Sequence, residues 1–523
     1  MDVTAAPQEA MLFNSKIFVL VFLPVTLIGY FWIARRLSAQ AARVWVLAAS
    51  WVFYGWWSLP YLGLLIAWML LNFAFAQWLY RLSQRSMVQR RLLLTLALAS
   101  NISLLGYYKY AAFVADGVAF LLGIEFAVAA IILPLAISFH TFQQIAYLVD
   151  VYNGAAPRYS LLQYLLFVSF FPQLIAGPIV HHHELMPQFR DPKIFRFNAV
   201  DVSHGLAFFV IGLLKKLLLA DPISSLSTPV FVAAVASPPN LFEAWRAALA
   251  FGLGLYFDFS AYSDMAVGLA RMFGIWLPYN FNSPYQATSI IEFWRRWHMT
   301  LSRWLRDYLY IPLGGSRKGQ TRRYVNLMLT MMLGGLWHGA AWPFVLWGAL
   351  HGLFLSINHL WTRLAAGAAR RGWRLELGCV PAQGLTFLAV TLAWVFFAAP
   401  SFSAAMAVLV GMAGGHGIIG SSRDAVGLLL TEGIGTARDW HGMRGIGSSL
   451  AQHAALFAGL AIVLFAPNSQ QMIDGSKAGT SPVLGQEPWR FRYGFETALA
   501  AAGGLLLSLA LMTDVKEFVY FQF

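Results

Sequence analysis

Charged residues are scarce in this sequence. Only 11% of its 523 residues are Asp, Glu, Lys or Arg, whereas 59% are hydrophobic, and soluble domains carry roughly 25% charged residues. Apolar runs recur along the whole chain, and each approaches the length that crosses about 30 Å of hydrocarbon. The composition excludes an ordinary soluble protein. It predicts an all-α polytopic membrane protein with roughly ten to twelve spans, and with some re-entrant or interfacial helices.

Cysteine is almost absent as well. The single residue, Cys379, excludes an internal disulfide and every CxxC or zinc-ribbon site. An isolated cysteine of this kind is typical of an inert thiol, although it could in principle carry an acyl thioester. The run from His181 to Glu184 has metal-binding residue types, but adjacent histidines cannot all point at one ion. We therefore expect no metal site.

The charges that are present are mostly basic, with 36 Lys and Arg residues against 23 Asp and Glu, for a net charge of +13. In a soluble protein such an excess would indicate nucleic acid as a partner. Here the basic residues cluster between apolar runs, as the positive-inside rule predicts, so we expect contact with membrane lipid and no nucleic-acid partner. The clusters at 35–43 and 81–91 predict cytoplasmic loops, which places the N-terminus outside.

No internal repeat and no soluble domain of useful size interrupts the chain. We therefore expect a single membrane domain over residues 1–523, with its core motifs at about 130–360. Two polar stretches, at about 411–449 and 468–492, are typical of extramembrane loops.

The most amphipathic stretch runs from Ser289 to Tyr308. It is too charged to span lipid, and Trp294 and Trp297 lie on one side at helical spacing. Ser289 occupies an N-cap position with Glu292 three residues later, which is the spacing of a capping box. We predict one helix that lies in the interface or dips into the protein.

Two histidines stand out against the apolar background. His338 lies among glycines and tryptophans in an otherwise membrane-like run, where an imidazole is either functional or buried against a backbone carbonyl. His298 lies in the amphipathic helix, one turn from Trp294 and Ser302. The 40 residues between the two histidines are enough for a helix, a basic loop and a return helix, so both can face one cavity. In that cavity a neutral imidazole could take the proton of an alcohol during acyl transfer.

Further side chains are candidates for the same cavity. Asp258 and Ser260 are polar groups in an apolar setting, which indicates either cavity lining or buried hydrogen bonding. Lys215 and Lys216 interrupt an apolar run, and we expect them to snorkel toward water. The predicted lining consists of Trp294, Trp297, Ser302, Trp337, Asp258 and Ser260.

A strongly basic loop separates the two histidines along the chain. Its cationic side chains could pair with the phosphates of an acyl-CoA. They could equally orient the helices and contact anionic lipid, and the sequence leaves both interpretations open. The residues concerned are Arg317, Lys318, Arg322 and Arg323.

Taken together, the motifs resemble those of the membrane-bound O-acyltransferase family, in its bacterial branch for cell-surface polymers. The resemblance covers essentially the whole chain and is most specific around His298 and His338. In chain order the motifs are Phe171-Pro172-Gln173, Gly177-Pro178-Ile179, Tyr256-Phe257-Asp258-Phe259-Ser260, Phe293-Trp294-Arg295-Arg296-Trp297-His298, Tyr310-Ile311-Pro312-Leu313-Gly314-Gly315 and Gly335-Leu336-Trp337-His338-Gly339.

The resemblance implies a ring of tilted helices around a central funnel or tunnel. It implies that His338 is the catalytic base and that His298 assists or positions. The implied reaction passes an acetyl group from cytoplasmic acetyl-CoA across the bacterial inner membrane, with no permanently bound cofactor. The acceptor would be an exopolysaccharide, alginate above all, reached directly or through a periplasmic SGNH-type acetyltransferase or an acyl-carrier protein.

Other functions stay open at this point. The same chemistry could serve peptidoglycan, cellulose or a D-alanylated teichoic acid. A transporter or flippase without catalysis would also need intramembrane polar residues, although no internal repeat supports it. A scaffold for a polysaccharide complex would need neither histidine.

Overall fold

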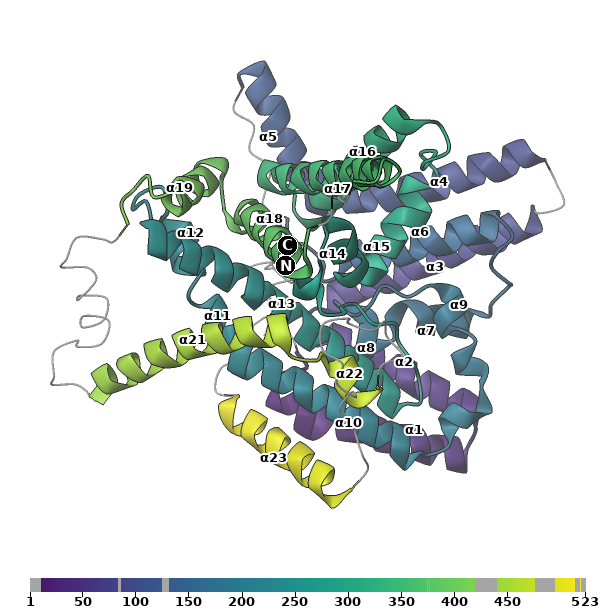
Figure 1. Ribbon diagram of the computed structural model, residues 1–523. Coiled ribbons are helices and arrows are strands. Elements are labelled where there is room, and N and C mark those ends of the chain that lie inside the picture. The colour runs from purple at the N-terminus through teal and green to yellow at the C-terminus, as the bar shows by residue number, and fades with distance from the viewer. Residues whose placement is uncertain are drawn as a thin grey trace. The chain divides into compact units, whose positions relative to one another are not determined.

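The protein is described by a computed structural model that covers residues 11–82, 86–124, 131–373, 375, 377–418, 440–475, 494–512 and 518, with 440–449 as backbone only. Throughout these residues the regular structure is helical and contains no strand (Figure 1). This confirms the predicted all-α class. Most of the predicted loop 411–449, and most of 468–492, lies outside the described residues; Trp440–Phe465 forms helix α21 and Ser469–Ile473 forms helix α22.

Five helical segments are long and apolar enough to cross a membrane, by length and composition alone, within the described parts of the chain. Three shorter apolar helices accompany them. The segments are Phe18–Arg36, Leu59–Arg81, Met87–Leu122, Trp342–Ala369 and Cys379–Ala398. The larger number of spans expected from the apolar runs, and their arrangement as a ring, stay predictions.

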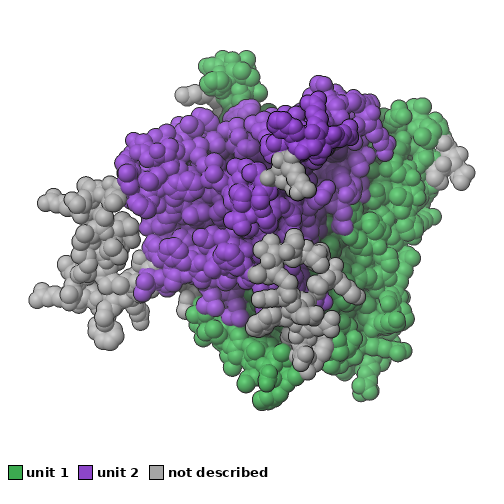
Figure 2. Space-filling view, viewed as in Figure 1, with its two compact units in different colours: residues 1–213, 262–279, 491–522 green, residues 214–261, 280–490, 523 purple. Residues whose placement is uncertain are grey.

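Contacts between Cα atoms divide the chain into two compact units, coloured separately in Figure 2. Unit 1 comprises residues 1–213, 262–279 and 491–522, and unit 2 comprises residues 214–261, 280–490 and 523. Helix α13, Leu241–Met272, contributes residues to both. The single membrane domain over the whole chain stays a prediction.

Unit 1 is built from apolar helices whose ends are set by local signals. Ser38 caps α2, its hydroxyl accepting from the Ala41 amide at 3.0 Å, and Pro60 lies in the first turn of α3. The helices are α1 (Leu23–Arg36), α2 (Ala39–Gly55), α3 (Leu59–Arg81), α4 (Met87–Leu105), α5 (Ala111–Leu122), α6 (Ile137–Tyr152), α7 (Leu161–Ser169), α8 (Phe171–Leu174), α9 (His182–Leu185), α10 (Ala199–Leu214) and α23 (Phe495–Leu511).

Small and polar residues bring helices of unit 1 together, as is usual where lipid removes the hydrophobic driving force. Asn101 donates through its amide to the side-chain oxygen of Asn72 at 2.6 Å, and this bond joins α4 to α3 in a fully buried position. Gly205 of α10 lies directly against Gly268 of α13, where a Cβ on either residue would overlap the other's carbonyl. These contacts make unit 1 a packed helical scaffold.

Unit 2 contains several short helices and a hairpin of two long helices. The hairpin consists of α16 (Gln320–His338) and α17 (Trp342–Ala369). The other helices are α11 (Asp221–Ser224), α12 (Thr228–Ala233), the first part of α13, α14 (Ile290–Arg296), α15 (Met299–Leu305), α18 (Cys379–Ala398), α19 (Phe402–Met412), α21 and α22.

Glycines allow α16 and α17 to approach closely. A Cβ at Gly335 would overlap the Phe344 carbonyl, and one at Gly348 would overlap the Met331 carbonyl. At Gly335 the backbone of α17 fills the space, so this glycine fixes the position of the residue that ends α16.

Candidate active site

All of the predicted site residues belong to unit 2. His298 lies between two short helices, since α14 stops at Arg296 and α15 begins at Met299. Its backbone is left-handed, with φ of 41°, which is unusual for a residue other than glycine. The prediction of one continuous helix from Ser289 to Tyr308 was therefore wrong.

Backbone contacts from an earlier segment hold this break open. The Asn282 amide donates to the Arg296 carbonyl at 2.9 Å, and the Met299 amide donates to the Asn280 carbonyl at 2.9 Å. The Thr300 hydroxyl donates to the Asn280 side-chain oxygen at 2.6 Å. These bonds bracket His298 and replace the helical bonds that the break removes.

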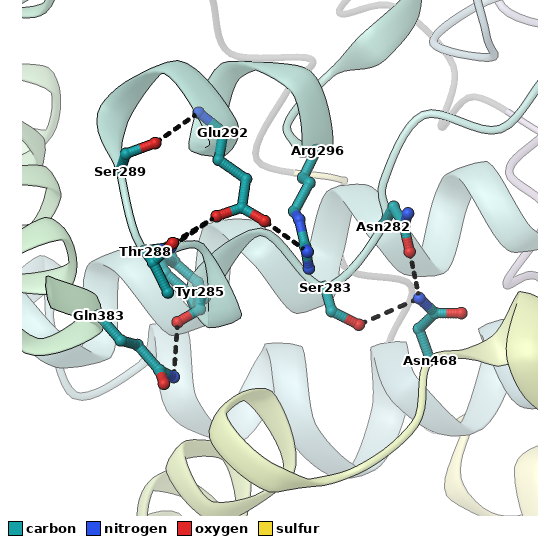
Figure 3. A network of polar contacts seen from close by, with 9 residues as sticks. All are labelled: Asn282, Ser283, Tyr285, Thr288, Ser289, Glu292, Arg296, Gln383 and Asn468. Carbon is teal, nitrogen blue, oxygen red and sulfur yellow. Dashed lines mark hydrogen bonds and ion pairs between the residues drawn. The ribbon is translucent and has the colours of Figure 1, made fainter. Parts of the chain in front are cut away.

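A network of polar contacts anchors α14 and the segment before it (Figure 3). The Ser289 hydroxyl accepts from the Glu292 amide at 3.2 Å, which confirms the predicted N-cap, and Arg296 donates to Glu292 at 2.6 Å. Glu292 also accepts at 2.8 Å from the amide of Thr288, the residue before the N-cap. Burial alone would raise the pKa of Glu292, but the bonds from Thr288 and the charge of Arg296 outweigh it and hold that pKa below its usual value.

A second part of the network reaches the segment from elsewhere in unit 2. The Asn468 amide donates to the side-chain oxygens of Asn282 and Ser283, both at 3.0 Å, and Gln383 donates to the Tyr285 carbonyl at 3.2 Å (Figure 3). Residues 282–296 are thus fixed from two sides. The position of His298 follows from this frame.

The His298 imidazole is buried, with 1% of the residue exposed. Its ring meets Phe259 edge to face, with centroids 4.7 Å apart, and faces Trp337 at 6.3 Å. Burial lowers the pKa of His298 to about 3. The ring is therefore neutral near neutral pH, as a proton acceptor requires.

His338 is the last residue of α16 and is 4% exposed. Its ring centroid lies 4.8 Å from that of Trp337, 5.2 Å from Trp347 and 5.1 Å from Phe397. Trp337 therefore contacts both histidines. The structure brings His298 and His338 to one indole ring; that the two histidines face one cavity stays a prediction.

The other predicted lining residues occupy different parts of the same unit. Trp297 is buried and stacks on Phe293 with the planes 16° apart, and its ring lies 5.0 Å from Trp394. Trp294 donates from its indole nitrogen to Nδ1 of His351 at 3.1 Å. The Ser302 hydroxyl donates to the Trp297 carbonyl at 3.3 Å.

Asp258 and Ser260 make buried polar contacts. Lys216 donates to Asp258 at 2.6 Å and also lies 2.9 Å from an Asp221 oxygen, while the side chain of Lys216 is only 1% exposed. Lys215 donates to the Ser260 hydroxyl at 3.4 Å. The prediction that Lys216 snorkels toward water was wrong, because two carboxylates pair with it inside the protein.

The basic residues between the histidines divide into two groups. Arg317 and Lys318 lie exposed in the turn before α16, whereas Arg322 and Arg323 belong to the first turns of α16 itself. Arg323 donates to the ring of His359, with its terminal nitrogen 3.0 Å from Nδ1. Arg323 therefore also joins α16 to α17, while the other three cations are accessible.

The His181 to His183 run belongs to unit 1. The two nitrogens of His182 contact Tyr159 and Asp150, each at 3.1 Å. Across the described residues no group of three His, Cys, Asp or Glu side chains could hold a metal ion. The run thus forms part of a buried hydrogen-bond network.

Sequence reasoning missed several members of the aromatic cluster around His338. Trp347 and His351 are four residues apart on α17 and share one face, and Trp394 and Phe397 come from α18. The available signal was the spacing of Trp347 and His351 together with Gly348 and Gly352. It was overlooked because the segment has the composition of an ordinary membrane span.

The chain matches known proteins over most of its length. A model of the membrane-bound O-acyltransferase family, MBOAT, matches residues 152–385, a range that includes His298 and His338. The peptidoglycan O-acetyltransferase of Helicobacter pylori is 42% identical over 434 residues, which cover 78% of this chain and 81% of that protein.

Two further groups of relatives are similar to it. The probable alginate O-acetylase AlgI of Azotobacter vinelandii is 40% identical over 77% of this chain and 78% of its own length. The teichoic acid D-alanyltransferase of Streptococcus thermophilus is 29% identical over 44% of this chain and 57% of its own length. The extent of these similarities confirms the resemblance seen in the motifs: the chain belongs to the membrane-bound O-acyltransferase family and is an O-acyltransferase.

Proposed function

We propose that this protein transfers acetyl groups for the O-acetylation of a cell-surface polysaccharide, with alginate as the first candidate acceptor. The observation that carries the proposal is the 40–42% identity to O-acetylases that act on such polymers, over more than three quarters of the chain. The buried histidines His298 and His338, which both contact Trp337, support it, because acyl transfer to a hydroxyl needs a neutral base in a dry site.

The proposed reaction starts from a thioester donor, which we take to be acetyl-CoA. The acceptor oxygen attacks the carbonyl carbon, its proton passes to the imidazole of His338, and the carbonyl electron pair moves onto oxygen. The tetrahedral intermediate then collapses, the carbon–sulfur bond breaks and the sulfur takes the proton from the imidazolium. The product is an ester, and His338 returns to its neutral form. His298, which contacts Trp337, would hold that indole ring in place beside the base.

The donor would approach from the side that carries the basic turn before α16. Arg317, Lys318 and Arg322 are exposed there, and guanidinium and ammonium groups bind phosphate oxygens well. The nucleotide phosphates of acetyl-CoA fit this chemistry. The cofactor is a consumed substrate, so no permanently bound group is required.

We place the protein in the bacterial inner membrane, which lies between a cytoplasmic donor and an external polymer. The apolar helices support a membrane location. A periplasmic SGNH-type acetyltransferase or an acyl-carrier protein would receive the acetyl group, unless the sugar hydroxyl takes it directly.

Peptidoglycan is the second candidate acceptor. The 42% identity to the peptidoglycan O-acetyltransferase of Helicobacter pylori favours it specifically. A teichoic acid acceptor has less support, since the similarity to the D-alanyltransferases covers only 44% of this chain.

The test is the O-acetyl content of secreted polysaccharide and of peptidoglycan from cells that carry His338→Ala. The control variant is His416→Ala, because His416 is also in unit 2 but bonds to the Pro239 carbonyl. Immunoblots of the membranes match the protein amounts. We expect His338→Ala to remove acetyl from one of the two polymers with normal polymer yield, and that polymer is the acceptor. Unchanged acetyl in both polymers would overturn the proposal in favour of a transporter or scaffold.

A further inference from the structure

A third histidine lies in the aromatic cluster and has no assigned role. His351 of α17 is completely buried. Its ring stacks nearly parallel to Phe293, with the planes 11° apart, and its centroid is 4.9 Å from that of Trp347. Trp347 in turn contacts His338, so one indole ring separates the two imidazoles.

The hydrogen bond from Trp294 fixes the tautomer of His351. An indole nitrogen can only donate, so Nδ1 of His351, at 3.1 Å from it, must accept and carries no proton. The imidazole is therefore neutral, with its single proton on Nε2. This conclusion follows from the bond alone, because only one arrangement of hydrogens is compatible with it.

Nε2 of His351 is a buried donor for which the described part of the chain supplies no acceptor. Among the described residues no acceptor lies within hydrogen-bonding distance of it, and the same holds for the indole nitrogen of Trp347 one turn earlier. Buried N–H groups in folded proteins are nearly always satisfied, by protein, by water or by a ligand. Two such groups one turn apart on α17 indicate a place where a bound molecule provides an oxygen.

The helical hairpin fixes this donor relative to His338. Gly335 and Gly348 allow α16 and α17 to pack directly against each other. At Gly352, next to His351, Met328 of α16 lies so close that a Cβ would not fit. His338 at the end of α16 and His351 on α17 therefore belong to one rigid pair of helices. A base and an N–H donor held in this way are the two groups that acyl transfer requires.

We propose that the Nε2–H of His351 donates a hydrogen bond to the carbonyl oxygen of the acyl group and stabilises the negative charge that this oxygen develops in the tetrahedral intermediate. The inference rests on the proposed function, since it assigns a second group to the same reaction. The proton stays on Nε2 throughout, and the covalent steps at His338 are unchanged. Trp294 acts as a positioning residue, because its bond to Nδ1 holds the proton on the outer nitrogen.

The test compares three substitutions at position 351 in cells. His351→Gln can place an amide N–H near the position of Nε2, His351→Asn places one near Nδ1, and His351→Leu has no donor. The measurement is the initial rate of polymer O-acetylation after induction, per molecule of membrane protein counted by immunoblot. We expect the Leu and Asn variants to lose about 100-fold or more, as for other removed oxyanion donors, and the Gln variant to stay within about tenfold of the wild type.

The outcomes separate this inference from the proposed function. If His338→Ala abolishes acetylation while His351→Leu keeps the wild-type rate per molecule, the base is right and the donor role is wrong. Equal losses in the Gln, Asn and Leu variants would assign His351 to packing and also overturn the donor role. If His338→Ala itself keeps full acetylation, the proposed function fails first.

Discussion

Replacing Lys216 with Met should destabilise the protein more than any other single loss of charge in unit 2. The ammonium of Lys216 lies 2.6 Å from Asp258 and 2.9 Å from Asp221, and the side chains of Lys216 and Asp258 are only 1% and 2% exposed. Methionine keeps the length of the stem but removes the ammonium that lies between the two carboxylates. Breaking a buried pair in this way costs about 3–5 kcal/mol.

Asp258→Asn should destabilise the protein less than Lys216→Met does. The amide oxygen can still accept from Lys216, and Asp221 keeps the ammonium paired, so the loss should resemble that of one hydrogen bond to a charged group, about 1.5–3 kcal/mol. The double variant Lys216→Met with Asp258→Asn leaves only Asp221, which is 15% exposed and partly hydrated. We therefore expect the double variant to be more stable than Lys216→Met alone.

The assay is unfolding of the purified protein in detergent, followed by tryptophan fluorescence as denaturant is added. Lys215→Met is the matched control, since Lys215 is next in the chain, is half-buried and donates to the Ser260 hydroxyl at 3.4 Å. Equal stability of the Lys216→Met and Lys215→Met variants would refute the reasoning. Because Phe259 follows Asp258 and packs on His298, we also expect slower acetylation per molecule in the Lys216→Met variant.

Two further predictions use the same unfolding assay. Burial lowers the pKa of His298 to about 3, whereas in the unfolded chain the same imidazole binds a proton below about pH 6.5. The contribution of the neutral ring to the free energy of unfolding is therefore complete above about pH 6.5. It falls by about 1.4 kcal/mol per pH unit as the pH drops toward 3. His298→Gln should flatten the stability profile between pH 7 and pH 5, and an unaltered slope would contradict the assignment. Gly335→Val should lower the free energy of unfolding by about 1–3 kcal/mol, because the new side chain pushes α16 away from the Phe344 carbonyl. Gly384→Val is the control, since a Cβ at that position meets open space. Equal losses of stability in the two variants would rule out the close contact.

The structural features that could be predicted from the sequence are those that depend on residues near one another in the chain. The N-cap at Ser289 and the burial of His338 both follow from local spacing and composition. The role of Lys216 could not be predicted in this way, because its partner Asp258 is 42 residues away and an isolated lysine in an apolar run has the pattern of a snorkelling side chain. The bond from Trp294 to His351 spans 57 residues and was missed for the same reason.

The break at His298 shows most clearly how distant contacts decide the site. In a continuous helix Trp294, His298 and Ser302 would form one row on one face. With the left-handed residue at 298, Trp294 instead reaches His351, while His298 turns to Phe259 and Trp337. No glycine or proline marks this position, and a left-handed residue of another type costs about 1–3 kcal/mol.

Bonds from Asn280 and Asn282 maintain that unfavourable backbone. Residues with unfavourable backbone conformations that the surrounding structure maintains are concentrated at functional sites. The break has a direct consequence for the chemistry, because it lets one short segment serve two imidazoles at once. Trp294 fixes the proton of His351, and His298 contacts Trp337, whose ring also lies against His338.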